Sequence, residues 1–435
     1  ESDINWYHNV MSLLRNWYFV QTAAINPEAQ GVAFKDEVMG RLIQFVSSHE
    51  VGHTLGLPHN MGSSAAYPVD SLRSASFTSK YGTAPSIMDY ARFNYVAQPE
   101  DKGVALMPNI GVYDKYAIEW GYRPILDKTA EEEKPILDSW IMAHDGDPLY
   151  RFGHQQGGDV VDPSSQTEDL GDNAMKASMY GIKNLQRIVP KLIEWTAEDG
   201  KNYDDLEILY GQVLSQFNRY MGHVSNNIGG VYENHKTYDQ EGAVYTPVAK
   251  AHQRDAMKFL QRELFQTPEW MLDQNIFNKI EYSGTVDRVR GVQVRTLNNV
   301  LSLGKMARLI EHETAMGSKA YTLTQMMSEL RRGIWSEIYN GRAIDTYRRN
   351  LQKGHIDRLA YLMTADSQRK LPSYGGYQKS TAVNTSQSDI RSVVRGELVT
   401  LRAQLRNGLA NAANTMSRYH MQDAIARIND ILDPK

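Results

Sequence analysis

The stretch that decides the fold covers residues 49–59 and reads His49-Glu50-Val51-Gly52-His53-Thr54-Leu55-Gly56-Leu57-Pro58-His59. Residues four apart in an α-helix lie on the same face, so His49 and His53 present two imidazoles one turn apart. Gly56 allows the chain to leave the helix in a sharp turn, after which His59 can come back to the other two histidines. Three imidazoles that meet in this way form a ligand set for a zinc ion.

Glu50 follows the first histidine directly and leans towards the side of the metal that the histidines leave open. A carboxylate in that place can act as the general base that takes a proton from a water molecule, because zinc lowers the pKa of that water.

The chain contains no cysteine, so only His, Asp and Glu can hold a metal. Histidines packed in an ordinary core are the alternative, which the rarity of His disfavours, with 12 among 435 residues.

Length and composition describe an ordinary globular protein. The chain has 435 residues, 41% of them hydrophobic and 23% charged, and a net charge of −4, which predicts two or three domains. It has no block of Lys and Arg, which argues against nucleic acid or an anionic membrane as a partner. No apolar run approaches the roughly 20 residues of a membrane span. The chain starts at Glu1 without a signal-peptide pattern, so we expect a fragment or a processed form.

Periodic apolar residues predict a mainly α fold. Before residue 125 the sequence predicts helices over 10–24, from Asp36 to about Gly56 and over 113–120, with an irregular stretch over 60–110. From Ala174 onward, amphipathic stripes follow one another, within 175–192, 206–217, 323–338 and 390–409. We expect the paired arginines 331–332 and 348–349 to lie on solvated faces, and residues 364–388 to form a linker.

These patterns divide the chain into three predicted parts. Residues 1–124 form a zinc-binding catalytic core fragment, residues 125–173 a loop-rich acidic connector, and residues 174–435 an irregular all-α domain. The absence of a fixed repeat period argues against a solenoid.

The connector contains several acidic residues among glycines, namely Asp159, Asp162, Glu168, Asp169 and Asp172. Hard oxygen ligands on a loop can bind Ca²⁺, although this spacing matches no EF-hand. A solvated acidic loop is the alternative, and it is the one we expect. His144 and His154 are further candidates for lining a cleft, although a lone histidine near glycine is usually a surface residue.

The spacing of the three histidines resembles that of the metzincins, a family of zinc metallopeptidases. Residues Ser86-Ile87-Met88-Asp89-Tyr90 resemble the Met-turn of that family, in which Met88 forms an apolar floor beneath the zinc ligands. By the same resemblance, Tyr90 would donate a hydrogen bond to the oxyanion of the reaction. An ordinary core methionine and a tyrosine packed near the turn are the alternatives. Residues 111–122 are similar to the helix that closes metzincin catalytic domains.

The chain looks closest to the large, exported bacterial zinc-dependent metalloproteases with a Met-zincin domain. This resemblance implies a zinc-dependent endopeptidase that acts on proteins or peptides outside the cytoplasm, in the periplasm, at the cell surface or in the medium.

The sequence departs from the pattern of the metzincins at two places. Asn60 follows the third histidine, where several branches have a characteristic residue. Only 48 residues precede His49, where metzincins have a twisted β-sheet, so we expect the upstream sheet to be largely missing, with 3–7 as a remnant strand at most.

Two functional hypotheses therefore stand side by side. The first is a zinc endopeptidase with Glu50 as its general base. The second is a zinc-stapled, non-catalytic binding or structural module in which the helical C-terminal domain is the working part. A gluzincin-type site, with a distant glutamate as third ligand, is disfavoured because His59 already stands at the metzincin spacing. No pattern in the sequence indicates an oligomeric state.

Overall fold

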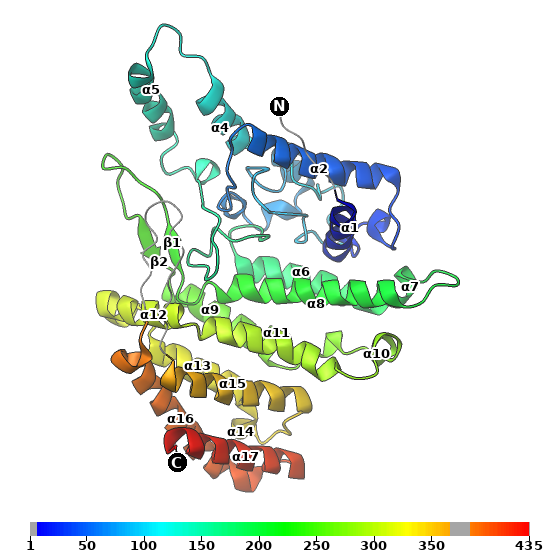
Figure 1. The fold of residues 1–435 in the computed structure, drawn as a ribbon, viewed down its shortest axis with the longest axis vertical. Coiled ribbons are helices and arrows are strands. Elements are labelled where there is room, and N and C mark those ends of the chain that lie inside the picture. Colours follow the sequence, from blue (N-terminus) through cyan, green and yellow to red (C-terminus); the bar gives the residue numbers. More distant parts are fainter. Residues whose placement is uncertain (1–6, 366–382, 435) are drawn as a thin grey trace. The chain divides into compact units, whose positions relative to one another are not determined.

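The computed structural model describes residues 7–365 and 383–434, and within them it is built almost entirely from helices (Figure 1). The α-helices are α1 (His8–Thr22), α2 (Asp36–Thr54), α3 (Ala75–Tyr81), α4 (Val112–Tyr122), α5 (Ala130–Met142), α6 (Ala174–Ile188), α7 (Leu192–Trp195), α8 (Asp204–Ser225), α9 (Lys250–Leu260), α10 (Gln274–Ile280), α11 (Thr285–Val300), α12 (Leu303–Met316), α13 (Leu323–Ile334), α14 (Ser336–Asn340), α15 (Thr346–Thr364), α16 (Asp389–Gly408) and α17 (Thr415–Leu432). The mainly α prediction is confirmed.

Two short strands depart from the prediction of a purely helical C-terminal part. β1 (Val231–Glu233) pairs with β2 (Tyr245–Pro247) in a two-stranded sheet. Each strand has three residues, which is too short for the alternation of apolar and polar residues that makes a strand visible in a sequence. Of the predicted remnant strand, residues 3–6 lie outside the described residues, and Tyr7 is the residue that precedes α1.

The contacts of the chain separate two compact units. The first contains residues up to 223 together with 231–246 and 273–280, and the second contains 224–230, 247–272 and 281–435. The boundary that we predict between 173 and 174 does not coincide with this division, because α6 and α8 pack within the first unit. For example, Asn184 on α6 donates hydrogen bonds to the carbonyls of Tyr95 (3.0 Å) and Ala97 (2.9 Å). On α8, the ring of Tyr220 lies 4.8 Å from that of Tyr95.

Helix α2 is the element that positions the candidate site in the first unit. It begins at Asp36, as predicted, and the acidic side chains of Asp36 and Glu37 lie in its first turn, near the positive end of the helix dipole. Its buried face carries Val38, Leu42, Phe45, His49 and Gly52. The helix ends at Thr54, and Gly56 adopts a φ of 83°, which is a left-handed conformation that favours glycine.

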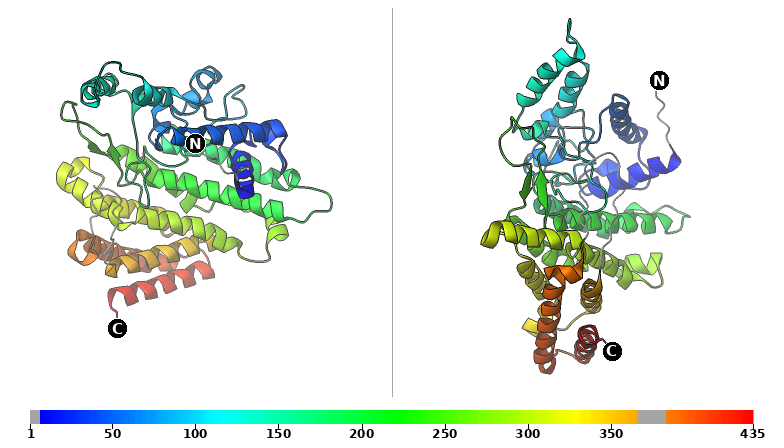
Figure 2. Two further views of the ribbon diagram at one scale, coloured as in Figure 1. Left: turned by 45° about the horizontal axis from the view of Figure 1, so that its top comes forward. Right: turned by 60° about the vertical axis from the view of Figure 1, so that its left-hand side comes forward.

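The second unit consists mainly of helices, most of which are coloured yellow to red in Figures 1 and 2. Two of the predicted apolar stripes are buried. On α13 the stripe comprises Leu323, Met326, Met327, Leu330 and Ile334, and on α16 it comprises Ile390, Val394, Leu398, Leu401 and Leu405. The last residue of each predicted stripe, Ile338 and Leu409, lies beyond the helix and is half-buried. Most of the linker predicted over 364–388 lies outside the described residues.

The prediction of solvated arginines in this unit was wrong for Arg331 and Arg348. Arg348 is 1% exposed, and its guanidinium donates hydrogen bonds to both carboxylate oxygens of Glu337, at 2.5 and 3.0 Å. Arg331 is also buried, and it donates to Glu397 at 2.5 Å. A buried charge is tolerated when an opposite charge and further hydrogen bonds compensate its loss of hydration, which sequence spacing alone does not reveal.

The stability of the chain should depend on pH through two buried histidines. Burial lowers the pKa of His355 to about 3 and that of His420 to about 4, so both are neutral in the folded chain. His420 donates from Nε2 to the side-chain oxygen of Gln352 at 2.8 Å. The unfolded chain binds protons on these residues below about pH 6.5, whereas the folded chain does not, so stability should fall as the pH falls from about 7 towards 4.

Replacing His420 by Gln keeps a donor for Gln352 but removes the titration. We expect the loss of unfolding free energy between pH 7 and 4.5 to be smaller in this variant, by up to about 3 kcal/mol. Chemical denaturation at several pH values measures this difference. Parallel pH dependences for the two proteins would show that His420 is not held neutral.

Candidate metal centre

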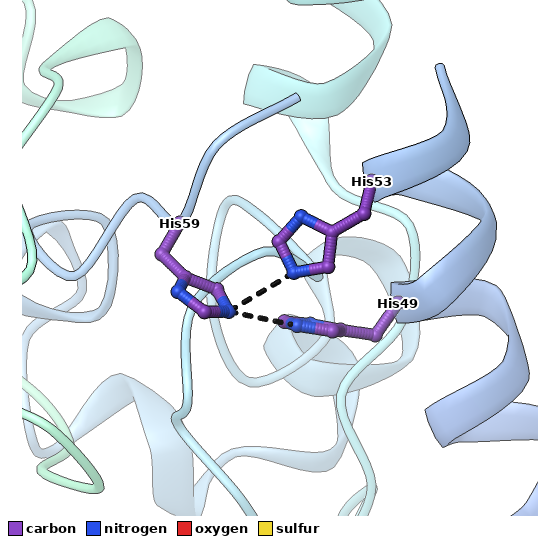
Figure 3. Close-up of side chains that lie close together, drawn as sticks. All are labelled: His49, His53 and His59. Atoms are coloured by element: carbon purple, nitrogen blue, oxygen red, sulfur yellow. Dashed lines mark hydrogen bonds between the residues drawn. The ribbon is translucent and has the colours of Figure 1, made fainter. Parts of the chain in front are cut away.

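The three histidines of the motif converge on one point (Figure 3). His49 and His53 project from α2, and His59 comes from the loop that follows it. The Nε2 atom of His59 lies 3.0 Å from that of His53 and 3.2 Å from that of His49. Over residues 7–365 and 383–434, they are the one group of three or more His, Asp or Glu side chains close enough to share a metal ion.

The hydrogen bonds of the other ring nitrogens show that these residues fit a metal. Nδ1 of His49 lies 2.7 Å from the carbonyl oxygen of Ile87, Nδ1 of His53 lies 2.9 Å from that of Leu57, and Nδ1 of His59 lies 2.7 Å from the amide oxygen of Gln155. Oxygen acceptors at all three Nδ1 atoms require the proton there, so each Nε2 carries a lone pair. Three lone pairs that face one another form a site that a metal ion could occupy.

The distances agree with this conclusion. Two nitrogens bound to one tetrahedral zinc ion at the usual 2.0–2.1 Å lie about 3.3 Å apart. The measured separations of 3.0 and 3.2 Å are close to that value. Burial also lowers the pKa of His49 to about 4, and burial lowers the pKa of His59 against an opposing hydrogen bond to Gln155. Both rings are therefore neutral at pH 7, as metal ligands must be.

The predicted Met-turn lies against the helix that carries the ligands. Met88 is 1% exposed, and a Cβ atom placed on Gly52 would lie 2.3 Å from its sulfur. The sulfur thus packs on α2 at the position just before His53. In addition, the backbone N–H of Asn60 donates to the carbonyl oxygen of Met88 at 3.2 Å, which ties the loop of His59 to the turn.

Asp114, a residue that the sequence analysis did not identify, holds the Met-turn in place. Its carboxylate accepts hydrogen bonds from the backbone N–H of Ile87 (2.8 Å), the hydroxyl of Ser86 (2.6 Å) and the backbone N–H of Gly111 (2.7 Å). Ile87 in turn supplies the carbonyl that orients His49. The sequence signal was available, because an acidic residue three positions after the residue that precedes a helix, here Gly111, can accept a hydrogen bond from the backbone N–H of that residue.

Tyr90 and Glu50 both lie near the histidines. The ring of Tyr90 is 4.5 Å from that of His59 and 5.2 Å from that of His49, and the guanidinium of Arg92 lies 4.9 Å from the centre of the Tyr90 ring. Burial raises the pKa of Tyr90, so its hydroxyl keeps its proton at neutral pH. The negative charge of Glu50 acts on both His59 and Tyr90, which places its carboxylate near them.

The acidic connector is not a solvated loop, and the structure gives no support to a calcium site there. Asp162, Glu168 and Asp169 are only 4 to 5% exposed. Asp162 pairs with Arg151 at 2.6 Å, and Glu168 pairs with two arginines, Arg92 at 2.9 Å and Arg219 at 2.5 Å. These arginines supply the positive charge that a calcium ion would otherwise bring. Asp159 and Asp172 are exposed.

Asp89 of the Met-turn forms a buried acidic pair with Asp169. Asp89 accepts from the hydroxyl of Ser63 at 3.0 Å and the backbone N–H of Ser64 at 2.7 Å, yet burial raises its pKa to about 7. Burial and the charge of Asp89 raise the pKa of Asp169 well above its usual value. The two carboxyl groups therefore do not both carry a charge at neutral pH.

The remaining histidine candidates, His144 and His154, are not members of the metal group. His144 stacks on the ring of Tyr150 at 3.6 Å, and His154 contacts the rings of Phe152 and His235. Gln155, which follows His154 directly and accepts from His59, is a further site residue that was not predicted. No local signal marks it, because its partner is 96 residues away in the chain.

Comparison with known proteins agrees with the geometry. The model of one family, described as Met-zincin, matches residues 31–342, which is most of the chain. This chain belongs to the Met-zincin family. The resemblance to a metzincin-type metallopeptidase domain is thereby confirmed, and zinc is the metal that the family implies. No curated protein and no solved structure matches the chain. Among the described residues of this Met-zincin, no helix is long and apolar enough to cross a membrane.

Gly52 offers a test of the contact between Met88 and the ligand helix. In a Gly52→Ala variant the new methyl group would meet the Met88 sulfur at 2.3 Å, so the side chain of Met88 must move. We expect a loss of about 1–3 kcal/mol in unfolding free energy, as for other overpacked cores, together with weaker zinc binding.

Gly40→Ala on the same helix is the matched control, because nothing lies within 4 Å of its added Cβ. The control should be neutral or stabilising, since alanine favours helix. Equal effects of the two substitutions would contradict the packing role.

Proposed function

We propose that this chain is a zinc-dependent endopeptidase, with His49, His53 and His59 as metal ligands and Glu50 as general base. The observation that supports this most directly is the convergence of three Nε2 lone pairs beside Glu50 and the hydroxyl-bearing ring of Tyr90. The family supports the class of zinc metallopeptidase. The endopeptidase activity, the residue roles and an exported location, which the resemblance implies, belong to the proposal.

When bound, the zinc ion would act as a Lewis acid that polarises the peptide carbonyl and increases the acidity of water. Glu50 accepts a proton from the attacking water as the water oxygen bonds to the carbonyl carbon. The same carboxyl group then delivers the proton to the peptide nitrogen as the C–N bond breaks, so that a carboxylic acid and an amine are released, and the acid then loses its proton to the solvent. Tyr90, which keeps its proton at neutral pH, donates a hydrogen bond to the carbonyl oxygen as it gains negative charge.

The Met-turn contributes by holding the ligands rather than by reacting. Met88 packs against α2 at Gly52, and Ile87 accepts from His49, so the turn fixes both the depth and the orientation of the first ligand. Ligands that are oriented before the reaction need not reorganise during it, which is a recognised source of catalytic rate.

A Glu50→Gln variant separates catalysis from metal binding. We expect both the variant and the wild type to bind one zinc ion per chain, because Glu50 is not one of the proposed ligands. Cleavage of a peptide library should fall by about 10²–10⁴-fold, the usual contribution of a general base. Metal analysis and mass spectrometry of the products measure the two quantities.

The competing hypothesis, a zinc-stapled module without activity, predicts a different pattern. Peptide cleavage would be absent in the wild type and Glu50→Gln would change nothing, while His53→Ala would unfold the first unit. It has physical support, because the three histidines connect α2, the loop of His59 and, through Ile87 and Gln155, two further segments.

Tyr90→Phe tests the proposed role of the tyrosine hydroxyl. The ring contacts with His49 and His59 remain in this variant, so zinc affinity and folding should not change. We expect kcat to fall by about 10- to 1,000-fold with a smaller change in KM, because the hydrogen bond is made mainly in the transition state. An unchanged kcat would assign Tyr90 to packing alone.

A further inference from the structure

The third histidine ligand is oriented in a different way from the first two. His49 and His53 direct their Nδ1 atoms to backbone carbonyl oxygens, whereas His59 directs its Nδ1 to the side chain of Gln155, at 2.7 Å. We infer that Gln155 is a positioning residue for the metal centre, which sets the tautomer and the orientation of His59. This inference rests on the proposed metal site and adds to it a residue from the segment between α5 and α6.

Asn60, the residue after His59, brings this segment to the metal centre. Its side chain is fully buried and forms hydrogen bonds with two residues of the segment: its oxygen accepts from the backbone N–H of Gly153 at 2.8 Å, and its nitrogen donates to the carbonyl of Arg151 at 3.0 Å. The N–H of Met61 also donates to the carbonyl of Gly153 at 2.9 Å. The loop of His59 and residues 151–153 are thus joined by three hydrogen bonds.

The contact between these two backbones is close enough to require glycine. A Cβ atom placed on Gly153 would lie 2.7 Å from the Cα of Gly62 and 1.9 Å from the hydroxyl oxygen of Ser165. No other residue type fits there without movement of the backbone. This close contact lies two residues before Gln155 and brings the backbone of its segment next to the loop of His59.

The segment is also held on the other side of Gln155. The side chain of Gln156 accepts from the backbone N–H groups of Val161 (2.8 Å) and Asp162 (3.0 Å) and donates to the carbonyls of Asp162 and Ser165, both at 2.8 Å. Gln156 thus fixes the local loop, whereas its neighbour Gln155 makes its bond to His59. The two adjacent glutamines therefore bind different parts of the structure.

The chemistry of an amide suits the role of Gln155. Its oxygen accepts the Nδ1 proton of His59, so the Nε2 lone pair must face the other two histidines. The amide is neutral, unlike a carboxylate, and it leaves the positive charge of the bound metal undiminished. An apolar side chain of similar length would leave His59 free to rotate or to change its tautomer.

Zinc affinity and the visible spectrum of the Co²⁺-substituted protein test this inference without reference to catalysis. In Gln155→Leu, which removes the acceptor, we expect zinc to bind about 10–100-fold more weakly in a chelator competition, with an altered Co²⁺ spectrum. In Gln155→Glu, which restores an oxygen acceptor, affinity should return to within a few-fold of the wild type or exceed it. His154→Ala serves as a neighbouring control and should leave both readouts unchanged.

Unfolding of the metal-free proteins separates positioning from simple loss of structure. Gln155→Leu should unfold at nearly the same denaturant concentration as the wild type when both lack metal. The inference is overturned if Gln155→Leu binds zinc as tightly as the wild type, or if Gln155→Glu is as weak as Gln155→Leu. A wild type that binds zinc but cleaves no peptide would contradict the proposed function and leave the role of Gln155 intact. A wild type that binds no zinc would overturn both.

Discussion

The hydrogen bonds at the three Nδ1 atoms are the constraint on which the candidate site depends. An imidazole on a flexible side chain can turn either of its ring nitrogens towards a metal. A hydrogen-bond partner at one nitrogen determines which of the two faces the metal. Here the partners are two backbone carbonyls and one amide oxygen, at 2.7 to 2.9 Å. Helix α2 brings two of the rings together, but the direction in which they point depends on residues outside the helix.

These partners depend in turn on a second layer of contacts. The carbonyl of Ile87 is held because Asp114 binds the Met-turn from the first turn of α4. Asn60 binds residues 151–153, so the backbone just before Gln155 lies next to the loop of His59. The ends of helices provide backbone groups and capping side chains that can make such contacts. The loops between them carry most of the groups that define the site.

The parts of this arrangement that could be predicted from the sequence are those that depend on local spacing. The helical positions of His49 and His53 and the apolar stripes of α13 and α16 follow from periods of three or four residues, and the turn follows from the conformational freedom of Gly56. The roles of Gln155 and Arg348, and the burial of Asp162 and Asp169, could not be predicted, because their partners are distant in sequence or their charges are compensated only after folding. The grouping of α6 and α8 with the first unit depends on contacts of the same long-range kind.

The dependence of His59 on Gln155 has a consequence for how the site is assembled during synthesis. A nascent chain that has emerged as far as residue 60 contains all three histidines, but the partners that orient His49 and His59 follow about 30 and 100 residues later. At typical rates of translation these segments arrive several seconds after the motif itself. At the proposed site, tight metal binding would therefore come late in synthesis, and the metal would stabilise a first unit that has already folded.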